Sequence, residues 1–366
     1  MNSTNEVFNR IDKAMEMAKS MPADGLEIHS ARDIKPEPIQ WLWNGWLAQG
    51  KFHLLAGLPG QGKTTIAMSM CAIVSGGGSW PDGSPCESGN VLIWSSEDDP
   101  NDTLVPRLIA AGNLDRCHFI QGVRENGELR SFDPARDISK IEEKIEHMGG
   151  VKLLVLDPVV TVVAGDSHKN NEVRRALQPL VDLAQRHDMA ILGLTHLSKG
   201  NAGQDPSLRV NGSIGFTAVA RTLFIAQKIP TGDGTEQGIF TKAKANTSSS
   251  SGAFKYTIEP VSIETNIETT RINWGQRIDG DARTLLMDSS EDSRDGSGNE
   301  LLDMLRAELE NGPMPVNDVL QSLESCGFSK DQIKRASVKL GVDKAKQGME
   351  GPWMWSLPVN PLDEVF

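Results

Sequence analysis

Several features that would assign a chain to a particular class are scarce in this sequence. Its four cysteines show no Cys-x-x-Cys spacing, which argues against a disulfide framework and a zinc ribbon. No apolar run approaches the roughly 20 residues that a membrane-spanning helix needs. Residues 1–20 are too polar and charged for a secretory signal. We therefore expect a cytoplasmic protein that makes no contact with a membrane.

Positive charge is also in short supply. The chain has 49 acidic residues against 37 lysines and arginines, a formal net charge of -12. This excess of acidic residues argues against a protein whose whole surface binds nucleic acid. It is compatible with a local basic patch or with a channel lined by basic residues. With 366 residues, 38% of them hydrophobic, the chain is long enough for two or three domains and too apolar for general disorder.

The pattern along the chain predicts five segments. Residues 1–40 form an N-terminal helical and extended segment. In residues 41–278, short apolar strands alternate with helical patterns, which indicates an α/β fold with a mostly parallel twisted sheet flanked by helices. Residues 279–299 are rich in Asp, Ser and Gly and predict a flexible linker. Residues 300–358 return to a compact helical pattern, and residues 359–366 form a tail.

A complete phosphate-binding motif of the form G-x-x-x-x-G-K-[ST] lies between the predicted strand Phe52–Ala56 and the predicted helix Thr64–Val74. Its glycines let backbone N–H groups surround phosphates, and the following helix adds its dipole. Lys63 would contact the β- and γ-phosphates, and Thr64 would offer a hydroxyl to Mg²⁺. An ordinary glycine-rich turn is the alternative. The residues expected to bind ATP are Gly57, Leu58, Pro59, Gly60, Gln61, Gly62, Lys63, Thr64 and Thr65.

Two further apolar strands end in carboxylates. Leu153–Leu156 is followed by Asp157, a candidate Mg²⁺ ligand that would lie beside the phosphate loop if the two strands are adjacent. The alternative is that Asp157 only begins a loop. Val91–Trp94 is followed by Glu97, a candidate general base for the water that attacks the γ-phosphate. Asp99, before Pro100, is expected to cap the next helix.

These motifs together resemble the RecA/DnaB-type ATPases, and more closely the RepA-like hexameric replicative helicases encoded by plasmids, phages and prophages. The resemblance spans about residues 41–260 and is carried by Trp41–Trp46, Ser95–Pro100, Leu156–Pro158, Leu194–Lys199 and Gly212–Gly215. It implies a RecA-like fold, a homo-hexameric ring, and ATP hydrolysis that drives movement along single-stranded DNA. The alternative is a recombination mediator or loader that ATP merely switches.

The resemblance also implies roles for single residues. Glu97 matches the catalytic glutamate, and His196 matches a histidine that senses the γ-phosphate, although it could simply cap a strand. Arg221 matches an arginine finger that acts on the ATP of a neighbouring subunit. Lys242 and Lys244 share one strand face by period two and resemble the finger pair of the wider DnaB-type group, or else they keep an exposed hairpin soluble.

DNA contacts are expected in two places. By resemblance, the polar stretch 197–213 is a pore loop whose Lys199 and Arg209 contact phosphates of single-stranded DNA. A loop that binds no nucleic acid is the alternative. Helical patterns at 301–308, 316–325 and 329–340, followed by a hairpin, predict a winged helix-turn-helix that binds duplex DNA or docks a replication partner. The cations on its predicted recognition helix are Lys330, Lys334, Arg335 and Lys339.

Overall fold

The computed structural model describes residues 26, 28–163, 165, 167, 169–197, 209–210, 214–231, 235–264, 266–286, 301–302, 304–310, 312–325, 328–346 and 351–358. Residues 1–39 form one unit and residues 40–366 another. The amphipathic helix expected near the N-terminus and most of the expected linker lie outside the described residues.

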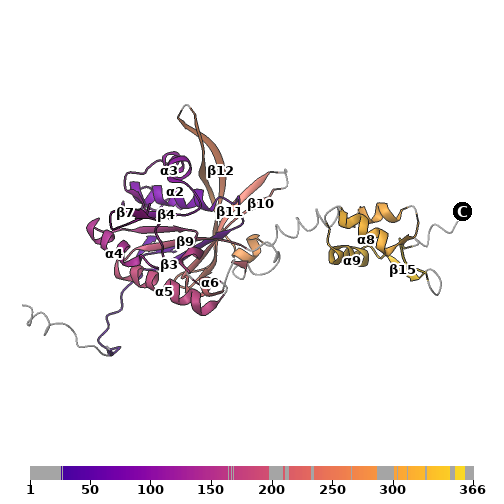
Figure 1. Ribbon diagram of the computed structural model, residues 1–366, viewed down its shortest axis with the longest axis horizontal. Helices are drawn as coiled ribbons and strands as arrows, with labels where there is room; N and C mark the ends of the chain where they lie inside the picture. The colour runs from indigo at the N-terminus through magenta and orange to yellow at the C-terminus, as the bar shows by residue number, and fades with distance from the viewer. Residues whose placement is uncertain are drawn as a thin grey trace, which may run out of the picture. The chain divides into compact units, whose positions relative to one another are not determined.

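A nine-stranded sheet organises the larger unit, in the order β13-β12-β11-β10-β3-β9-β8-β4-β5 (Figure 1). Six strands run parallel, and they include the three strands predicted above at Phe52–Ala56, Val91–Trp94 and Leu153–Leu156. Each of these three is one residue longer than predicted. The parallel strands are β3 (Phe52–Gly57), β4 (Val91–Ser95), β5 (Cys117–Phe119), β8 (Leu153–Asp157), β9 (Ala190–His196) and β10 (Thr222–Pro230).

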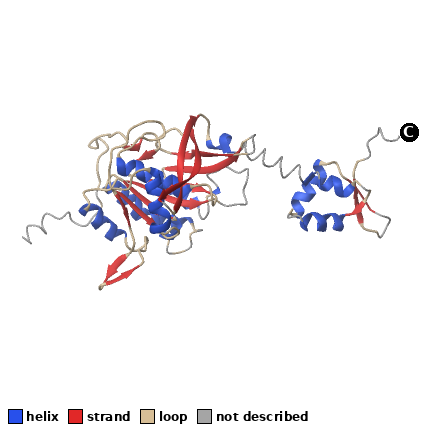
Figure 2. Ribbon diagram, turned by 90° about the horizontal axis from the view of Figure 1, so that it is seen from above, coloured by secondary structure: helices blue, strands red, loops and turns tan. Residues whose placement is uncertain are grey.

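Antiparallel strands complete one side of this sheet. They are β11 (Glu236–Ala245), β12 (Ala253–Glu264) and β13 (Ile267–Ile278). The last two form a long hairpin that packs against α3 (Figures 1 and 2). Separate two-stranded hairpins are formed by β1 (Trp41–Trp43) with β2 (Leu47–Ala48) and by β6 (Val123–Glu125) with β7 (Glu128–Arg130).

Helices cover both faces of the sheet, and each face has its own apolar core. One face carries α2 (Lys63–Gly76) and α3 (Val105–Ala111), which follows a short π-helix, η1 (Pro100–Leu104). The other carries α4 (Ile138–His147), α5 (Asn170–Arg186) and α6 (Ile214–Val219), with a 3-10 turn, η2 (Val159–Val162), after β8. The strands between them are buried on both faces, which explains their lack of polar alternation. The predicted α/β class, a mostly parallel sheet flanked by helices, is confirmed.

Residues 301–358 have a third apolar core, which includes Leu305, Val319, Ile333 and Trp355. Residues 301–302 and 304–309 are helical. They are followed by β14 (Met314–Pro315), α8 (Val316–Ser325), α9 (Lys330–Lys339), β15 (Asp343–Lys346) and β16 (Trp353–Ser356). These strands form an antiparallel sheet in the order β14-β16-β15. This element order is compatible with the predicted winged helix-turn-helix.

Among the helices that the structure describes, none combines the length and apolarity needed to cross a lipid bilayer.

Candidate active site

The phosphate loop joins the carboxyl end of β3 to the amino end of α2, as its sequence predicts. Gly60 and Gly62 have φ angles of 78° and 83°, in the left-handed region that favours glycine. A Cβ on Gly57 would lie 2.5 Å from the backbone oxygen of Ala226, so no larger residue fits there. These glycines therefore shape a loop whose backbone stays open to a phosphate chain.

Thr64 and Asp157 meet directly at this loop. The Thr64 hydroxyl donates a hydrogen bond to Asp157 Oδ2 at 3.0 Å. The strands β3 and β8 that precede the two segments are not neighbours, because β9 lies between them. Asp157 nevertheless lies beside the phosphate loop, as expected. The reason is that α2 begins above the edge of the sheet at which β3, β9 and β8 all have their carboxyl ends. Burial raises the pKa of Asp157 to about 6, with Glu97 and Asp98 adding to the rise and Thr64 and Lys63 opposing it.

Thr64 and Asp157 have the chemistry expected for magnesium. A hydroxyl and a carboxylate are hard oxygen ligands, and a divalent cation would stabilise the ionised form of the buried Asp157. The described residues contain no group of three or more His, Cys, Asp and Glu side chains that could hold a metal ion. Mg²⁺ usually keeps several waters and binds through one or two carboxylates together with phosphates of the substrate. The residues present therefore fit a magnesium ion that arrives with a nucleotide.

His196 lies between Lys63 of the phosphate loop and Glu97, the candidate general base. Lys63 Nζ lies 3.3 Å from His196 Nδ1, and His196 Nε2 lies 3.7 Å from Glu97 Oε1. An ammonium group can only donate, so Nδ1 must accept, and the ring proton then sits on Nε2, facing Glu97. Burial lowers the pKa of Lys63, while the Asp157 and Glu97 carboxylates oppose that shift. The site thus contains a continuous polar chain from Lys63 to Glu97.

The turn after β4 holds Glu97 in place. Ser95 Oγ accepts hydrogen bonds from the backbone N–H groups of Glu97 and Asp98, at 3.2 and 3.0 Å. Asp99 caps η1 by accepting from the N–H of Asn101 at 2.7 Å, so the predicted capping role is confirmed. Two of the three consecutive acids therefore face the site, while the third terminates the turn.

The sequence did not indicate that the β12–β13 hairpin contacts the phosphate loop. The Tyr256 hydroxyl donates to the carbonyl of Gln61 at 2.6 Å, and Gln61 Oε1 accepts from the N–H of Lys228. Ile258 packs over Gly62 so closely that a Cβ there would lie 2.6 Å from its terminal methyl. No local pattern in the sequence identifies what this hairpin covers. With β4 and β10 it encloses a cleft of about 440 Å³ above the loop.

Arg221 lies at the amino ends of the parallel strands, whereas this cleft lies at their carboxyl ends. Its backbone N–H donates to the carbonyl of Phe52, at the start of β3, whereas the phosphate loop begins at Gly57, at the end of β3. Five residues of strand span roughly 16 Å at 3.3 Å per residue. The exposed Arg221 side chain therefore cannot reach the phosphate site of its own chain.

Lys242 and Lys244 do not lie on one face, contrary to the expectation. A β-bulge between β10 and β11 shifts the register, so the two side chains leave the strand on opposite sides of the sheet. Lys242 Nζ lies 4.5 Å from the Trp46 ring centroid, and Lys244 Nζ donates to the carbonyl of Ala220 at 2.9 Å. Both ammonium groups are used within their own chain, so the finger-pair assignment is withdrawn.

The expected DNA contacts have different outcomes. Lys199 lies outside the described residues. Arg209 is only 9% exposed, and burial lowers its pKa, so this guanidinium is not presented to a DNA phosphate and its assignment is wrong for this conformation. The four cations of the predicted recognition helix are all exposed on α9, with Lys330 in a long 3.9 Å ion pair to Glu324. The exposed residues are Lys330, Lys334, Arg335 and Lys339.

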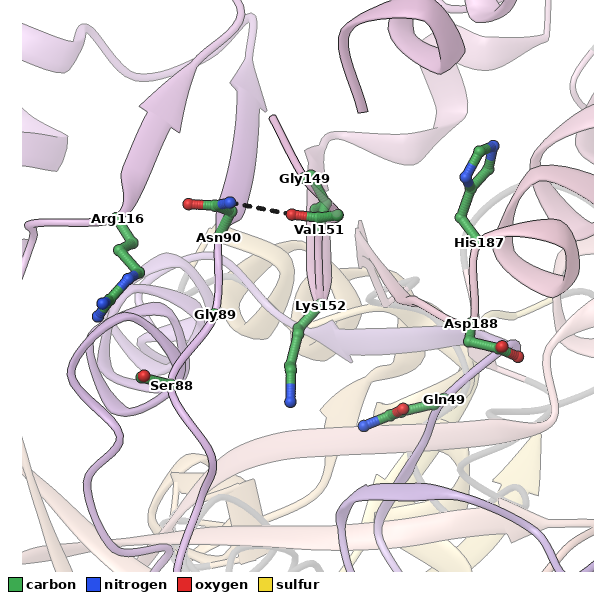
Figure 3. Close-up of a pocket in the computed structure, with 11 residues that line it drawn as sticks. Gln49, Ser88, Gly89, Asn90, Arg116, Gly149, Val151, Lys152, His187 and Asp188 are labelled. Carbon is green, nitrogen blue, oxygen red and sulfur yellow. Dashed lines mark hydrogen bonds between the residues drawn. The ribbon is translucent and has the colours of Figure 1, made fainter. Parts of the chain in front are cut away.

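A second polar cavity, of about 450 Å³, opens near the amino ends of β4, β8 and β9 (Figure 3). Lys152 on its wall forms a 2.7 Å ion pair with Glu87, and Arg116 donates to the carbonyl of Ser75 at 3.2 Å. Asn90 donates to the carbonyl of Gly150 at 3.0 Å. No residue assigned to ATP or DNA from the sequence lines this cavity.

Comparison with known proteins gives one family. Residues 18–202, just over half of the chain, match the AAA_25 family model, described as an AAA domain. The match includes the phosphate loop, Glu97, Asp157 and His196 and ends before Arg221. No curated protein matches the chain.

Among solved structures, the chain is similar to a KaiC-like protein, PH0186, from the hyperthermophilic archaeon Pyrococcus horikoshii OT3. The two are 17% identical with a TM-score of 0.42, and the alignment covers 64% of this chain and 99% of that one.

Proposed function

Because the chain belongs to the AAA_25 family, and is thus a P-loop ATPase of the RecA/DnaB-type superfamily, we propose that it is a ring-shaped DNA motor. In this proposal it is a replicative helicase of a mobile element, of the RepA-like type, that hydrolyses ATP to move on single-stranded DNA. The observation that carries the proposal is the polar chain Lys63–His196–Glu97 beside the Thr64–Asp157 pair.

This arrangement supports hydrolysis of a nucleoside triphosphate. Lys63 would transfer its hydrogen bond from His196 to the β- and γ-phosphates, while Thr64 and Asp157 would hold Mg²⁺. Bound Mg²⁺ would neutralise negative charge that develops on the phosphates. Glu97 would accept the proton of the attacking water.

His196 gives the same site a means of reporting its state. When Lys63 turns to a phosphate, the acceptor Nδ1 loses its donor, and the imidazole becomes free to rotate. His196 ends β9, and the segment 198–208 that follows includes Lys199. A change at the γ-phosphate would thus pass along one strand end to the candidate DNA loop.

Assembly is supported by the separation of Arg221 from its own phosphate loop. A guanidinium that neutralises transition-state charge can be supplied in trans, and a repeated head-to-tail contact that closes produces a ring. We expect a homo-hexamer. The test mixes Arg221→Ala chains with Lys63→Ala chains, each inactive alone. Mixed assemblies should regain partial ATPase activity, because some interfaces then join an intact phosphate loop to an intact arginine.

The control for this mixture pairs Lys63→Ala with Arg283→Ala, an exposed arginine to which no role is assigned. Arg283→Ala alone should keep normal activity. Full ATPase activity in an isolated wild-type monomer, measured with light scattering, would contradict the trans arrangement.

The motor itself is tested by unwinding of a forked duplex and by ATPase rates with and without single-stranded DNA. We expect DNA to stimulate hydrolysis and Lys199→Ala to weaken that stimulation, with basal hydrolysis unchanged. The salt dependence of stimulation should become shallower in this variant, because fewer condensed counterions are released. Lys334→Ala and Arg335→Ala should weaken only the binding of duplex DNA.

The second candidate is a DNA-binding switch, such as a recombination mediator or loader, in which ATP only changes the assembly. The same site chemistry supports it, since hydrolysis can reset a switch. DNA-stimulated ATPase without any unwinding favours the switch. An ATPase rate that single-stranded DNA leaves unchanged across a salt series excludes the motor.

A further inference from the structure

The polar cavity at the amino ends of β4, β8 and β9 takes no part in the proposed function (Figure 3). Asn90 and Lys152, which line it, directly precede β4 and β8. At their other ends, the same three strands lead to Glu97, Asp157 and His196. The cavity and the phosphate site therefore lie at opposite ends of the same strands, and a ligand in one does not occupy the other. Its volume of about 450 Å³ suits a small molecule.

The wall of this cavity is formed by the chain itself. Gly149 and Gly150, in the turn between α4 and β8, have φ angles of 72° and 103°, in the left-handed region that favours glycine. The side-chain amide of Asn90 donates to the carbonyls of Met148 and Gly150, at 3.0 Å each. These two bonds fasten the start of β4 to the turn and so fix the shape of the wall.

Lys152 is positioned with its ammonium group toward the cavity (Figure 3). A Cβ on Gly89 would lie 2.5 Å from Lys152 Cγ, so the lysine stem packs directly on the backbone of Gly89. The ammonium group pairs with Glu87 at 2.7 Å, but that carboxylate is 89% exposed. An ion pair with such an exposed partner contributes little, and an ammonium group has three donors. Lys152 can therefore donate to a ligand phosphate.

Arg116 supplies a second positive charge to the same cavity. Its backbone N–H donates to Ser75 Oγ at 2.9 Å, and its Nη1 donates to the Ser75 carbonyl at 3.2 Å. These bonds hold Arg116 against α2, and the carbonyl contact uses one of the five N–H donors of a guanidinium. Two cations at one cavity, in a chain with a net charge of -12, favour an anionic ligand. Phosphate is the anion that a guanidinium and an ammonium group bind well together.

The remaining wall offers groups of a different kind. Asp188 is the single acid among the lining residues, and Gln49 lies near it (Figure 3). A carboxylate accepts hydrogen bonds from hydroxyl groups, and an amide both donates and accepts. Asp188 would repel a phosphate, so the two ends of the cavity select different parts of one ligand.

We propose that this cavity binds a small sugar phosphate. Lys152 and Arg116 bind its phosphate, and Asp188 and Gln49 bind its hydroxyl groups. The inference does not depend on the proposed motor activity, because no residue of the phosphate loop lines the cavity.

Titration calorimetry on the full-length chain tests the site, with the phosphate loop filled by MgADP. Ribose 5-phosphate is the probe for the whole site, and inorganic phosphate is the probe for its cationic end. We expect ribose 5-phosphate to bind at one site per chain. Lys152→Met keeps an unbranched stem over Gly89 and removes the charge, so the affinity for both probes should fall by about tenfold or more. Lys144→Met, at an exposed position of α4 outside the cavity, is the matched control and should bind both probes as wild type does.

A second variant separates the two ends of the cavity. Asp188 has a φ of 47°, which glycine adopts readily, so Asp188→Gly should keep the turn. Its affinity for ribose 5-phosphate should fall by about fivefold, because hydrogen bonds to the carboxylate are lost. Its affinity for inorganic phosphate should stay the same or rise, because a like charge is removed. Unchanged binding of MgADP in each variant shows that the fold is intact.

Three results overturn the inference. The first is a wild-type chain that does not bind ribose 5-phosphate. The second is a Lys152→Met variant that binds MgADP and also binds ribose 5-phosphate as tightly as wild type does. The third is a short single-stranded oligonucleotide that binds through Lys152 when neither small probe does, which assigns the cavity to the nucleic-acid backbone.

Discussion

Replacement of Asp157 by asparagine should stabilise the ligand-free protein at alkaline pH, although it removes a proposed metal ligand. Burial raises the pKa of Asp157 from 3.8 to about 6. In the unfolded chain this carboxyl ionises above about pH 4, whereas in the folded protein it ionises only above about pH 6. As the pH rises through this window, the unfolded state loses its proton first, and the fold becomes relatively less stable.

The size of the effect follows from the shift in pKa. At 1.36 kcal/mol per unit, a shift of two units corresponds to about 3 kcal/mol of destabilisation once the pH exceeds 6. At pH 5, between the two values, about half of this penalty has developed. An asparagine keeps an oxygen that can accept the hydrogen bond of Thr64 but carries no charge. The variant should therefore gain up to about 3 kcal/mol at pH 8 and clearly less at pH 5.

The assay is urea unfolding of the full chain at pH 8 and pH 5, followed by tryptophan fluorescence, with the midpoint and slope of the central-sheet transition compared. Asp98→Asn is the control, since it removes a carboxylate of the same cleft that pairs with Arg107 at 2.9 Å and should give no stabilisation. Addition of MgATP should stabilise the wild type more than Asp157→Asn. Equal or lower stability of Asp157→Asn at pH 8, or a gain that is the same at both pH values, would refute the reasoning.

Three further expectations follow from single contacts. Glu97→Gln should keep ATP binding and lose turnover, because an amide cannot accept the proton of the attacking water; normal single-turnover hydrolysis would remove Glu97 from the base role. Gly62→Ala should destabilise the chain by about 1–2 kcal/mol from its left-handed φ alone, with contact against Ile258 adding to the cost, as measured by thermal unfolding. Lys242→Met should leave ATPase activity normal, because Lys242 Nζ contacts Trp46 and donates to the carbonyl of Gly45 within its own chain, and a large loss of activity with an unchanged melting temperature would restore its finger role.

The features that could be predicted from the sequence were those that depend only on residues close to one another along the chain. The phosphate loop needs glycines, a lysine and a threonine at fixed spacing, so Gly57–Thr64 reveals it without tertiary information. The buried strands can be predicted from their unbroken apolar runs, because helices cover both of their faces and no polar alternation is needed. The capping role of Asp99 is equally local, since the carboxylate bonds to a backbone N–H two residues away.

The remaining features were decided by contacts between distant parts of the chain. A single β-bulge between β10 and β11 places Lys242 and Lys244 on opposite faces of the sheet. A period-two sequence pattern contains no information about such a register shift. Arg209 looked like an exposed cation in a polar stretch, yet tertiary packing buries it. The hydrogen bond from Tyr256 to Gln61 spans 195 positions of sequence, and the contact between Lys63 and His196 spans 133. The contact between Lys63 and His196 forms because the parallel strands β3 and β9 bring their carboxyl ends to one edge of the sheet. The bond from Tyr256 forms because the antiparallel strand β12 lies beside the phosphate loop. Both contacts depend on tertiary structure and not on any residue's neighbours in the chain.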